Sequence, residues 1–552
     1  TQNSIKNPLR EISESFGERV LDSNSADTQG GEFNISSFFR GKDAGTFFGA
    51  EVLIPKFKGS RLKLEYDGTD YKLEGYEPVK QKSRFNYSFL YPVTKNFHLK
   101  LGYVRGNTLN VGFSYSGNYR KRDPFIKKKD FPKKVPRSEA FKFVNARNNT
   151  NLYVSSLKYL ASEKIYLQTA NLNDDGVLHI SYNQNKHTSH PRAIGRAIRV
   201  LDQLSPPAVT SFKLTNVNAD QSMFSAHVIR QEFKRYEKLQ QTELLRLTSD
   251  ITKEHSIELQ DHEYQPKPEL PAFFWKLTPS IRSQIGGPDG FYFGDISLTF
   301  HSDLIIKKNF NFLFRSAVGI YDTFDNLKLA SDSVLPHVRS DIVQYLKQSR
   351  KFNITRAQFN YLDNPVGDLY YKLSAGIFEH MFGGIGTEVL YRPFDKNWAV
   401  GAEMWRVKQR DYDMQFSFRD YETTTGHINL YYKEPKSQIT AFLKGGRYLA
   451  GDSGITLDLS RRFNSGFTLG VFASKTDISK FEFGEGSFDK GFYFHLPIEV
   501  FYSNYSRGIT GFGLRPLTRD GAQYLTHGHH LWGVTDQGQL INVDRDWSTI
   551  YE

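Results

Sequence analysis

Apolar and polar residues alternate through most of this chain in segments of about ten residues. The pattern is clearest in residues 383–429, where Ile385, Thr387, Val389 and Tyr391 share one face of a strand that repeats with period two. Glycine and charged side chains occupy the opposite face. Because a tilted strand of about 9 to 11 residues crosses a bilayer, the alternation predicts the strands of an outer-membrane β-barrel.

Such segments form two stretches. The first includes residues 97–104 and 109–115, which a short turn around Gly106 joins into a predicted antiparallel hairpin. The second begins near residue 270, and we expect it to run to the end of the chain as roughly thirteen or fourteen strands. That number of strands is enough to close a barrel.

Between about residue 137 and residue 265 the period changes. Pro191 suits the first turn of a helix over residues 190–204, and a stripe of small and branched apolar residues follows it. The predicted helices are 151–160, 190–204 and 230–241, and the predicted short strands are 164–169, 177–182, 209–215 and 223–229. With no lipid-facing pattern, this α/β module is expected in the periplasm.

The predicted fold is mainly β, with two antiparallel outer-membrane β-barrel regions and an inserted periplasmic α/β domain. Residues 1–136 are expected to form the C-terminal part of a first barrel whose upstream strands are missing from this chain. Residues 137–268 form the α/β domain, and residues 269–552 form the second barrel. An open sheet edge cannot face lipid, so an upstream fragment or a second chain is expected to pair with the strand near Glu32.

Composition narrows the classes of function. Aromatic residues make up 15% of the chain, which suits the aromatic girdles of a membrane barrel. The absence of cysteine excludes disulfides, thiolate metal ligands and cysteine nucleophiles. No apolar run of 18 residues occurs and the mean hydropathy is −0.52, which excludes a helical membrane span.

The net charge of +12 leaves two interpretations open, a polyanionic partner or a lysine-rich solvated surface. The strongest local cluster of basic residues, 120–134, contains proline and aromatic residues without a helical period. It therefore predicts a flexible connector, and no nucleic-acid partner is expected.

Motifs of enzymes are missing from the contexts that their chemistry requires. No nucleophile elbow, Walker loop, HExxH helix or dinucleotide fingerprint occurs. The pairs Gly383-Gly384 and Gly445-Gly446 stand at strand ends with no helix after them, so they predict turns or bends in a barrel wall. We expect no catalytic activity and no cofactor.

Two polar clusters raise the question of a site. His527, His529 and His530 offer imidazole ligands for a metal, but no cysteine or ExxH partner accompanies them, and a polar loop is the simpler interpretation. Glu482 and Glu485 could flank a glycosidic bond, but solvation in a loop or ion pairing with Lys490 is the favoured interpretation. No metal site is predicted.

The faces opposite the apolar ones are more informative, because they would line the interior of the second barrel. Charges, amides and aromatic rings mix there, as would suit a sugar chain held by stacking and hydrogen bonds; a solvated barrel interior is the alternative for any single residue. The candidate contacts for a polysaccharide are Glu388, Arg392, Glu403, Trp405, His427, Asn429, Asp458 and Arg462.

Several longer motifs occur in the order of one known family. They include FFGAEVLIP (47–55), SHPRAIGRAIRVL (189–201), EVLYRPF (388–394), GRYLAGDSGITL (446–457) and PLTRDGAQ (516–523). With these motifs, which extend over nearly the whole chain, the sequence resembles the YjbH family of outer-membrane proteins, a family that includes GfcD and is encoded with exopolysaccharide and capsule genes.

The resemblance implies a non-catalytic protein of the bacterial outer membrane that assists secretion or surface assembly of an exopolysaccharide or capsule. The implied partners are a polysaccharide, with an acidic one among the alternatives, outer-membrane lipid and lipopolysaccharide, and other polysaccharide-secretion proteins. Two other functions stay open from the residues alone. One is a general porin or solute channel, and the other is a soluble β-protein that binds or degrades polysaccharide.

Overall fold

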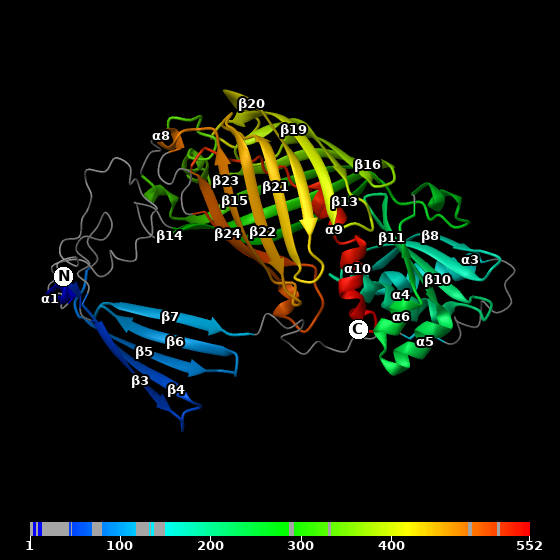
Figure 1. The fold of residues 1–552 in the computed structure, drawn as a ribbon, viewed down its shortest axis with the longest axis horizontal. Coiled ribbons are helices and arrows are strands. Elements are labelled where there is room, and N and C mark those ends of the chain that lie inside the picture. The colour runs from blue at the N-terminus through cyan, green and yellow to red at the C-terminus, as the bar shows by residue number, and fades with distance from the viewer. Residues whose placement is uncertain are drawn as a thin grey trace.

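A computed structural model shows a protein built mainly from antiparallel sheets (Figure 1). The residues that it describes are 4–6, 9–13, 43–45, 47–68, 80–117, 132, 134–136, 149–254, 256–285, 292–328, 333–483, 488–515 and 519–552. Near the N-terminus, β1 (Ser4–Lys6) pairs with β2 (Asp43–Gly45). The short helices outside the main units are α1 (Leu9–Ile12), η5 (Ser256–Asp261), η6 (Phe324–Asn326), α7 (Ile342–Leu346), α8 (Lys480–Phe483) and η7 (Ile498–Val500). No helix in the described ranges is both long and apolar enough to cross a membrane.

The first large element is a five-stranded antiparallel meander. Its strands are β3 (Phe47–Ile54), β4 (Ser60–Asp67), β5 (Phe85–Pro92), β6 (Phe97–Val104) and β7 (Thr108–Tyr115). The predicted hairpin is confirmed, and its turn places Arg105 and Gly106 at positive φ, as a tight hairpin turn requires. Leu109, Val111 and Phe113 share one exposed face of β7.

The α/β unit has a mixed sheet in the order β12-β11-β10-β9-β8. Its elements are α3 (Thr150–Ser162), β8 (Ile165–Leu172), β9 (Val177–Gln184), α4 (His190–Leu204), β10 (Ser211–Asn218), β11 (Gln221–Ile229), α5 (Arg230–Leu239), α6 (Thr242–Leu247) and β12 (Asp250–Thr252). Strands β9 and β10 are parallel, and α4 connects them. The helix predicted at residues 190–204 is confirmed: Ser189 caps it, and its stripe with Ile194 and Leu201 is fully buried.

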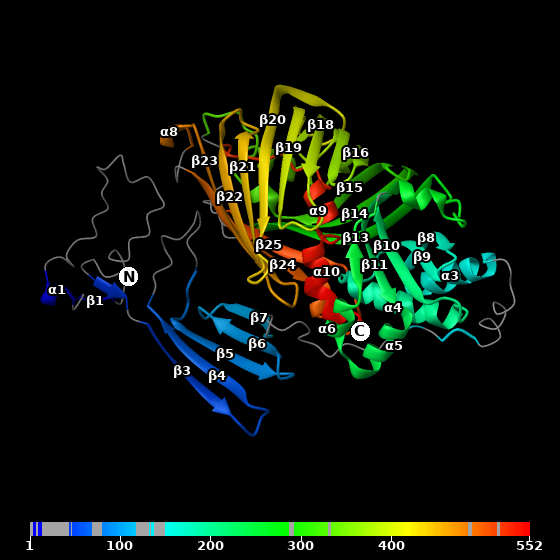
Figure 2. The same cartoon turned by 45° about the vertical axis from the view of Figure 1, so that its right-hand side comes forward.

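The largest element is a thirteen-stranded antiparallel sheet in sequence order. Its strands are β13 (Ala272–Ile285), β14 (Tyr292–Lys307), β15 (Phe310–Asp322), β16 (Asn353–Val366), β17 (Leu369–Ile377), β18 (Phe382–Tyr391), β19 (Trp398–Arg410), β20 (Phe418–Lys433), β21 (Ile439–Arg447), β22 (Ser453–Arg462), β23 (Thr468–Thr476), β24 (Asp489–Pro497) and β25 (Ile509–Leu514). Figures 1 and 2 show this sheet curling around a helical segment. Among the described strands no pairing joins β13 to β25.

The predicted architecture of mainly β structure in antiparallel sheets is therefore confirmed, whereas closure of the first or the second sheet into a barrel stays a prediction. So do the predicted boundaries at residues 136 and 268.

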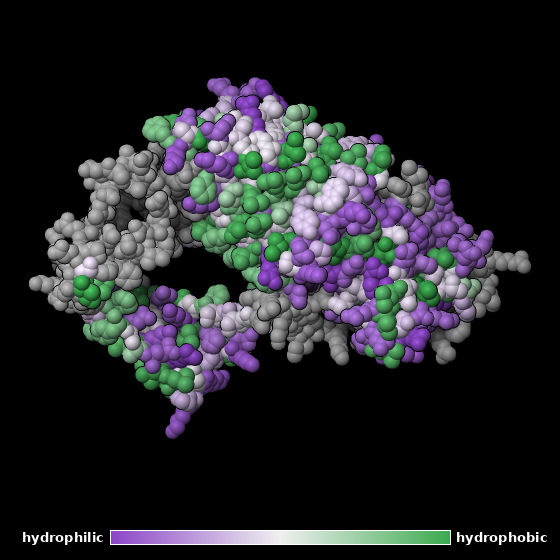
Figure 3. Space-filling model, viewed as in Figure 1, coloured by the Kyte–Doolittle hydropathy of each residue, from purple (hydrophilic) through white to green (hydrophobic). Residues whose placement is uncertain are grey.

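The strands in the middle of the large sheet have one apolar outer face and one polar inner face. On β18 to β20 the outward Ile385, Met404 and Ile428 are 62%, 60% and 64% exposed, while the inward Glu388 and Trp405 are 3% and 1% exposed. Figure 3 shows hydrophobic side chains gathered over this outer face, in contrast with the hydrophilic surface of the α/β unit. The period-two interpretation of the sequence thus places both faces correctly.

The strands stop at Leu514, so the prediction that they continue to the end of the chain is wrong. Residues 519–552, which we call the tail, instead form α9 (Leu531–Asp536), α10 (Leu540–Asp546) and η8 (Trp547–Thr549). The tail lies inside the curve of the sheet, with α9 against β17 and β18 (Figure 2). One continuous apolar core joins all three parts, with Leu201 of the α/β unit, Leu390 of the sheet and Leu531 of the tail among its members.

Candidate functional site

The candidate site is the polar inner face of the large sheet where it meets the tail. Five of the eight residues predicted from the alternation contact the tail or the tail's immediate neighbours: Glu388, Arg392, Glu403, Trp405 and His427. They come from three adjacent strands, because inward positions on neighbouring strands stand side by side in register.

Arg392, which directly follows β18, holds α9 through its whole guanidinium group. The group stacks on the Trp532 ring, with its central carbon 3.6 Å from the ring centroid. It donates hydrogen bonds to the Trp532 carbonyl and the Thr535 hydroxyl, both at 3.0 Å, and pairs with Asp536 at 2.7 Å. A planar guanidinium can satisfy stacking and several acceptors together, which an ammonium cannot do.

Glu403 on β19 is the centre of a second group. Its Oε2 lies 2.9 Å from Nε2 of His527 and accepts a hydrogen bond of 3.1 Å from the Trp405 indole. On its other side, Nδ1 of His427 lies 3.5 Å from Oε1. The His527 ring stacks on Trp405 with centroids 4.1 Å apart, and Trp405 in turn covers Gly386, where a Cβ would stand 2.3 Å from the indole. The bare backbone of Gly386 is therefore what lets the indole lie flat on the wall.

Lys372 on β17 supplies the cation between these two groups. Its ammonium lies 3.1 Å from Glu388 and donates to Nδ1 of His527 at 2.9 Å and to the carbonyl of His529 at 3.0 Å. Because Nδ1 of His527 accepts from the lysine, its Nε2 carries the proton and donates to Glu403. Glu388 also accepts the backbone N–H of Leu531 at 2.9 Å, at the start of α9. The sheet thus fixes the tail through charged side chains and through a hydrogen bond to the backbone of the tail.

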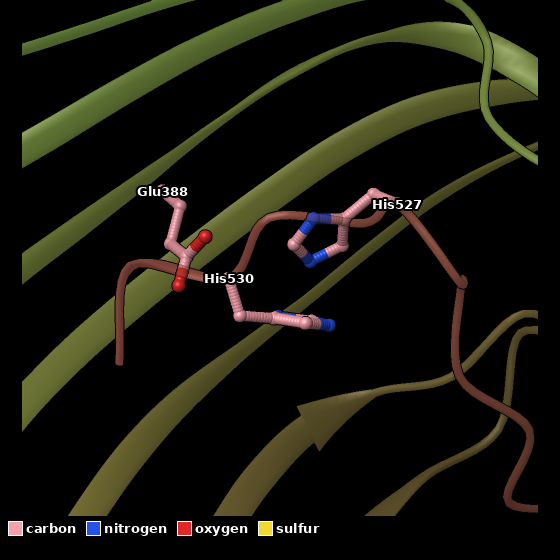
Figure 4. Close-up of side chains that lie close together, drawn as sticks. All are labelled: Glu388, His527 and His530. Atoms are coloured by element: carbon pink, nitrogen blue, oxygen red, sulfur yellow. The ribbon is translucent and has the colours of Figure 1, made fainter. Parts of the chain in front are cut away.

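Three side chains here have the chemistry of metal ligands. Ligand atoms of Glu388, His527 and His530 lie within 4.8 Å of one another, and Figure 4 shows them converging from β18 and the tail. Both nitrogens of His527 are already engaged, and Lys372 neutralises Glu388. A divalent ion could enter only if the ammonium moved away or lost its proton, since like charges at this separation repel strongly. Glu388 and His527 therefore hold the Lys372 ammonium in the place where a metal ion would bind. The absence of a metal site stays a prediction.

The remaining predicted residues lie apart from this group. Asn429 is buried on β20, and its Oδ1 has no hydrogen-bond partner within the described part of the chain. Asp458 on β22 accepts a hydrogen bond of 2.8 Å from Tyr493. Arg462 ends β22 and lines a small cleft with Asp546 and Thr549 of the tail.

The other polar clusters of the sequence do not join the site. Glu482 accepts hydrogen bonds from Ser479 at the start of α8, and Glu485 lies outside the described residues. The basic cluster 120–134 also lies outside them, apart from residues 132 and 134.

The far end of the tail is fixed to the α/β unit. Arg192 on α4 pairs with Glu552, and Arg199 donates to the Tyr551 carbonyl at 2.7 Å. The Trp547 indole donates to the Thr242 carbonyl at 3.1 Å. The α/β unit and the sheet are thus joined through the tail, in addition to a direct contact of Lys253 with Asp368 at 2.8 Å.

The sequence did not reveal Lys372, Trp532 or Asp536 as members of the site. Lys372 stands on an inward position of β17, so extending the alternation to that strand would have found it. The two tail residues gave no such signal beyond their place after the histidine motif, because the inward path of the tail depends on contacts distant in sequence.

Together these features define a class of protein. A long antiparallel sheet, apolar outside and polar inside, curves around the C-terminal tail, and the tail connects the sheet to an α/β unit. The chain belongs to the YjbH family, as predicted: the family model, described as "Exopolysaccharide biosynthesis protein YbjH", matches residues 1–537. A relative from Escherichia coli (strain K12), "Uncharacterized lipoprotein YjbH", is 31% identical over 557 residues, which cover 97% of this chain and 76% of that protein.

One solved structure with a slight likeness is OmpT (in-vitro folded), an outer membrane protein of Vibrio cholerae. It is 9% identical and covers 41% of this chain and 79% of its own, with a TM-score of 0.21. A likeness of this size bears on neither the fold nor the site. The family match shows that the chain is a member of a family related to exopolysaccharide biosynthesis.

Proposed function

We propose that this protein lies in the bacterial outer membrane and assists secretion or surface assembly of an exopolysaccharide without catalysing a reaction. The large sheet would cross the membrane and the α/β unit would stand in the periplasm. The family description supports the link to exopolysaccharide. The name of the E. coli relative, a lipoprotein, agrees with a place in the cell envelope.

The observation that carries the membrane part of the proposal is the apolar outer face of the large sheet. Side chains such as Ile385, Met404, Ile428 and Ile455, on β18, β19, β20 and β22, are more than half exposed. Removing one such side chain from water is worth about 1.5–3 kcal/mol, so a face of this kind favours a lipid environment. Contiguous apolar surface on this scale marks a membrane or a protein interface.

The charged groups of the inner face around the tail support a structural role rather than a role in catalysis. These acids and bases are engaged with one another and with the tail, as in the group of Glu403, His527 and Lys372. We therefore keep a non-catalytic role, with the polysaccharide, outer-membrane lipid and other secretion proteins as partners. The five-stranded sheet would be completed by strands from an upstream fragment or a second chain, since β3 and β7 each have one neighbour among the described strands.

A general porin is the second candidate, and the position of the tail argues against it. The tail packs on the inner face with Leu531 and Thr535 of α9 fully buried, so the enclosed space is occupied by protein. In planar bilayers we expect no sustained ion conductance from the purified protein, and steady porin-like steps would favour the channel.

The proposal is tested by deleting the gene in a strain that produces the polymer. Extracellular polysaccharide should fall while synthesis at the inner membrane continues, and the intact gene supplied in trans should restore it. Unchanged surface polymer in the deletion strain would refute the proposal. Fractionation tests the location separately: the protein should need detergent for extraction and migrate differently in gels with and without heating, whereas release into detergent-free extract would favour a soluble protein.

A further inference from the structure

A cavity of about 880 Å³ lies where the α/β unit, the large sheet and the tail meet. Strands β8 to β11 form one wall, β13 to β15 form another, and α9 with the residues around it forms the third. Its volume falls in the range of about 300–1,000 Å³ that is usual for small-molecule sites. None of the residues predicted to contact polysaccharide lines it, and it adjoins the group around Glu403 only through His529 and His530 of the tail.

The lining is unusually rich in carboxamide side chains. Seven asparagine and glutamine residues contribute, from β8, β9, β10, β15 and the tail: Gln168, Asn183, Gln184, Asn216, Asn218, Asn311 and Gln537. In several of them either the amide oxygen or the amide NH₂ group forms a hydrogen bond within the described part of the protein, but not both. Asn216 and Asn218 donate to the carbonyls of Tyr182 and Val534, and within the described structure no hydrogen bond uses their side-chain oxygens.

Other amides have the opposite end available. The oxygen of Asn311 accepts from Asn360, and the oxygen of Gln537 accepts from Arg507, while no hydrogen bond in the described ranges uses their NH₂ groups. The cavity therefore offers amide acceptors and amide donors together. A sugar hydroxyl both donates and accepts, so pairs of such amides match neighbouring hydroxyl groups.

The formal charges of the lining cancel. Asp220 and Glu269 oppose Lys308 and Arg507, and Lys308 lies 3.4 Å from Asp220. Three histidines add donors or acceptors without a fixed charge. A strongly anionic ligand would find no excess of positive charge here, in contrast to the net charge of the whole chain.

The lining also has apolar surfaces against which a sugar ring could pack. Phe274 of β13 is 62% exposed and Leu270 precedes it on the same wall. Polar groups that fix orientation beside apolar surface are the usual combination in a ligand site. Water would solvate Phe274 poorly, whereas the apolar face of a pyranose ring would cover it.

We propose that this cavity binds a short stretch of a neutral polysaccharide at the junction of the α/β unit and the large sheet. The inference rests on the proposed function and adds the place and the charge class of the ligand. Asn183 and the amides of β10, β15 and the tail recognise hydroxyl groups, and Phe274 packs against a ring. Because α9 supplies one wall, the tail is part of the binding site.

Gly533 of α9 gives a direct test. It lines the cavity, and a Cβ built on it meets no atom within 4 Å. Gly533→Phe should fill the cavity without a clash at the backbone, and Gly533→Ala is the matched control that leaves most of the space free. Asn183→Ala removes one amide from the opposite wall and keeps the inference testable if the larger substitution disturbs folding. Heat-modifiable migration in gels verifies that each variant is folded.

The probe is exopolysaccharide from the producing strain, cut by partial acid hydrolysis into short fragments, with hexagalacturonate as an acidic comparison. Calorimetry on the full chain in detergent should show binding of the neutral fragments, weakened about tenfold or more by Gly533→Phe, about threefold by Asn183→Ala, and least by Gly533→Ala, whose methyl group fills only a small part of the cavity. Equal binding by the Gly533→Phe variant, no binding of any fragment, or tighter binding of hexagalacturonate would each overturn the inference. Loss of secretion on gene deletion together with no binding would refute this site alone; binding with unchanged secretion would refute the proposed function alone.

Discussion

The contact between α4 and the tail can be broken by a single methyl group at Gly195. A Cβ built there would stand 1.7 Å from the carbonyl oxygen of Ile550 and 2.8 Å from its carbon. To reach an ordinary contact of 3.4 Å, that oxygen must retreat by about 1.7 Å. The obstacle is backbone, so no side chain can rotate out of the way. Gly195→Ala should therefore separate the end of the tail from α4.

The size of the effect follows from two opposing contributions. Overpacking of this kind costs about 1–3 kcal/mol, and a backbone obstacle puts the cost near the upper value. Alanine in the interior of a helix gains about 1 kcal/mol over glycine. The net loss of about 2 kcal/mol lowers the equilibrium constant for tail attachment about 30-fold.

Hydrogen exchange measured by mass spectrometry can detect this release. Amides of residues 540–552 should exchange about 30-fold faster in Gly195→Ala than in the wild type, while amides of β18 and β19 keep their protection. Gly533→Ala is the matched control, because its new methyl group meets open space. It should leave exchange in the tail unchanged or slightly slower.

Unchanged exchange of residues 540–552 in Gly195→Ala would refute the packing of the tail on α4. Equal acceleration in both glycine variants would also refute it, since only one of the two methyl groups meets an obstacle. Loss of protection throughout the large sheet would show that the tail cannot be released locally.

Three further predictions concern the same parts of the molecule. Arg392→Ala removes the hydrogen bonds and the ring contact that Arg392 makes with α9, although Lys433 stays 3.6 Å from Asp536. Hydrogen bonds to a charged group are worth about 1.5–3 kcal/mol, so proteolysis of the tail should become faster. Arg392→Lys should be intermediate, and an unchanged cleavage rate would contradict the contact of Arg392 with α9. Burial lowers the pKa of His187 to about 2 and that of His190 to about 3. Below about pH 6.5 the unfolded chain therefore takes up protons that the folded α/β unit does not. The free energy of unfolding of the α/β unit should be constant above that pH and should fall by about 2 kcal/mol per histidine between pH 7 and pH 5. Denaturant titrations at both pH values test this, and the variant with glutamine at both positions should lose most of the pH dependence. The hydroxyl oxygens of Ser189 and Thr549 are 2.5 Å apart, and the chain has no cysteine. The double variant Ser189→Cys and Thr549→Cys should therefore oxidise to a disulfide that tethers the tail to α4. Two free thiols after oxidation, measured by thiol labelling, would contradict the contact between these two residues.

The sequence predicted those features that depend on near neighbours in the chain. Alternation with period two located the strands of both meanders and assigned Ile385 to the outside and Glu388 to the inside, because side chains of a strand must alternate. Proline in the first turn and a regular apolar stripe gave α4 its observed bounds, residues 190–204. These signals lie within one element, so a single sequence is enough to reveal them.

Features that depend on distant contacts could not be predicted in this way. The helices α9 and α10 have only six and seven residues, too few for a strong helical period. The sequence placed His527 in a polar loop, yet it is buried between Trp405 and Glu403. Its position is set by Lys372 and Glu403, each more than a hundred residues away in the chain. Pattern alone cannot bring such partners together.

The path of the tail also constrains the order in which this protein can be assembled. The tail follows all thirteen strands of the large sheet in the chain, yet it occupies the inner face that those strands surround. In a sheet that closes as predicted, a segment that is synthesised after every strand must be in place before the space around it becomes inaccessible. If the sheet crosses the membrane as proposed, a machinery that inserts its strands one after another would have to keep the sheet accessible until Trp532 packs against Arg392. Insertion into the membrane and docking of the α/β unit would then be a single event, completed when residues 547–552 reach α4.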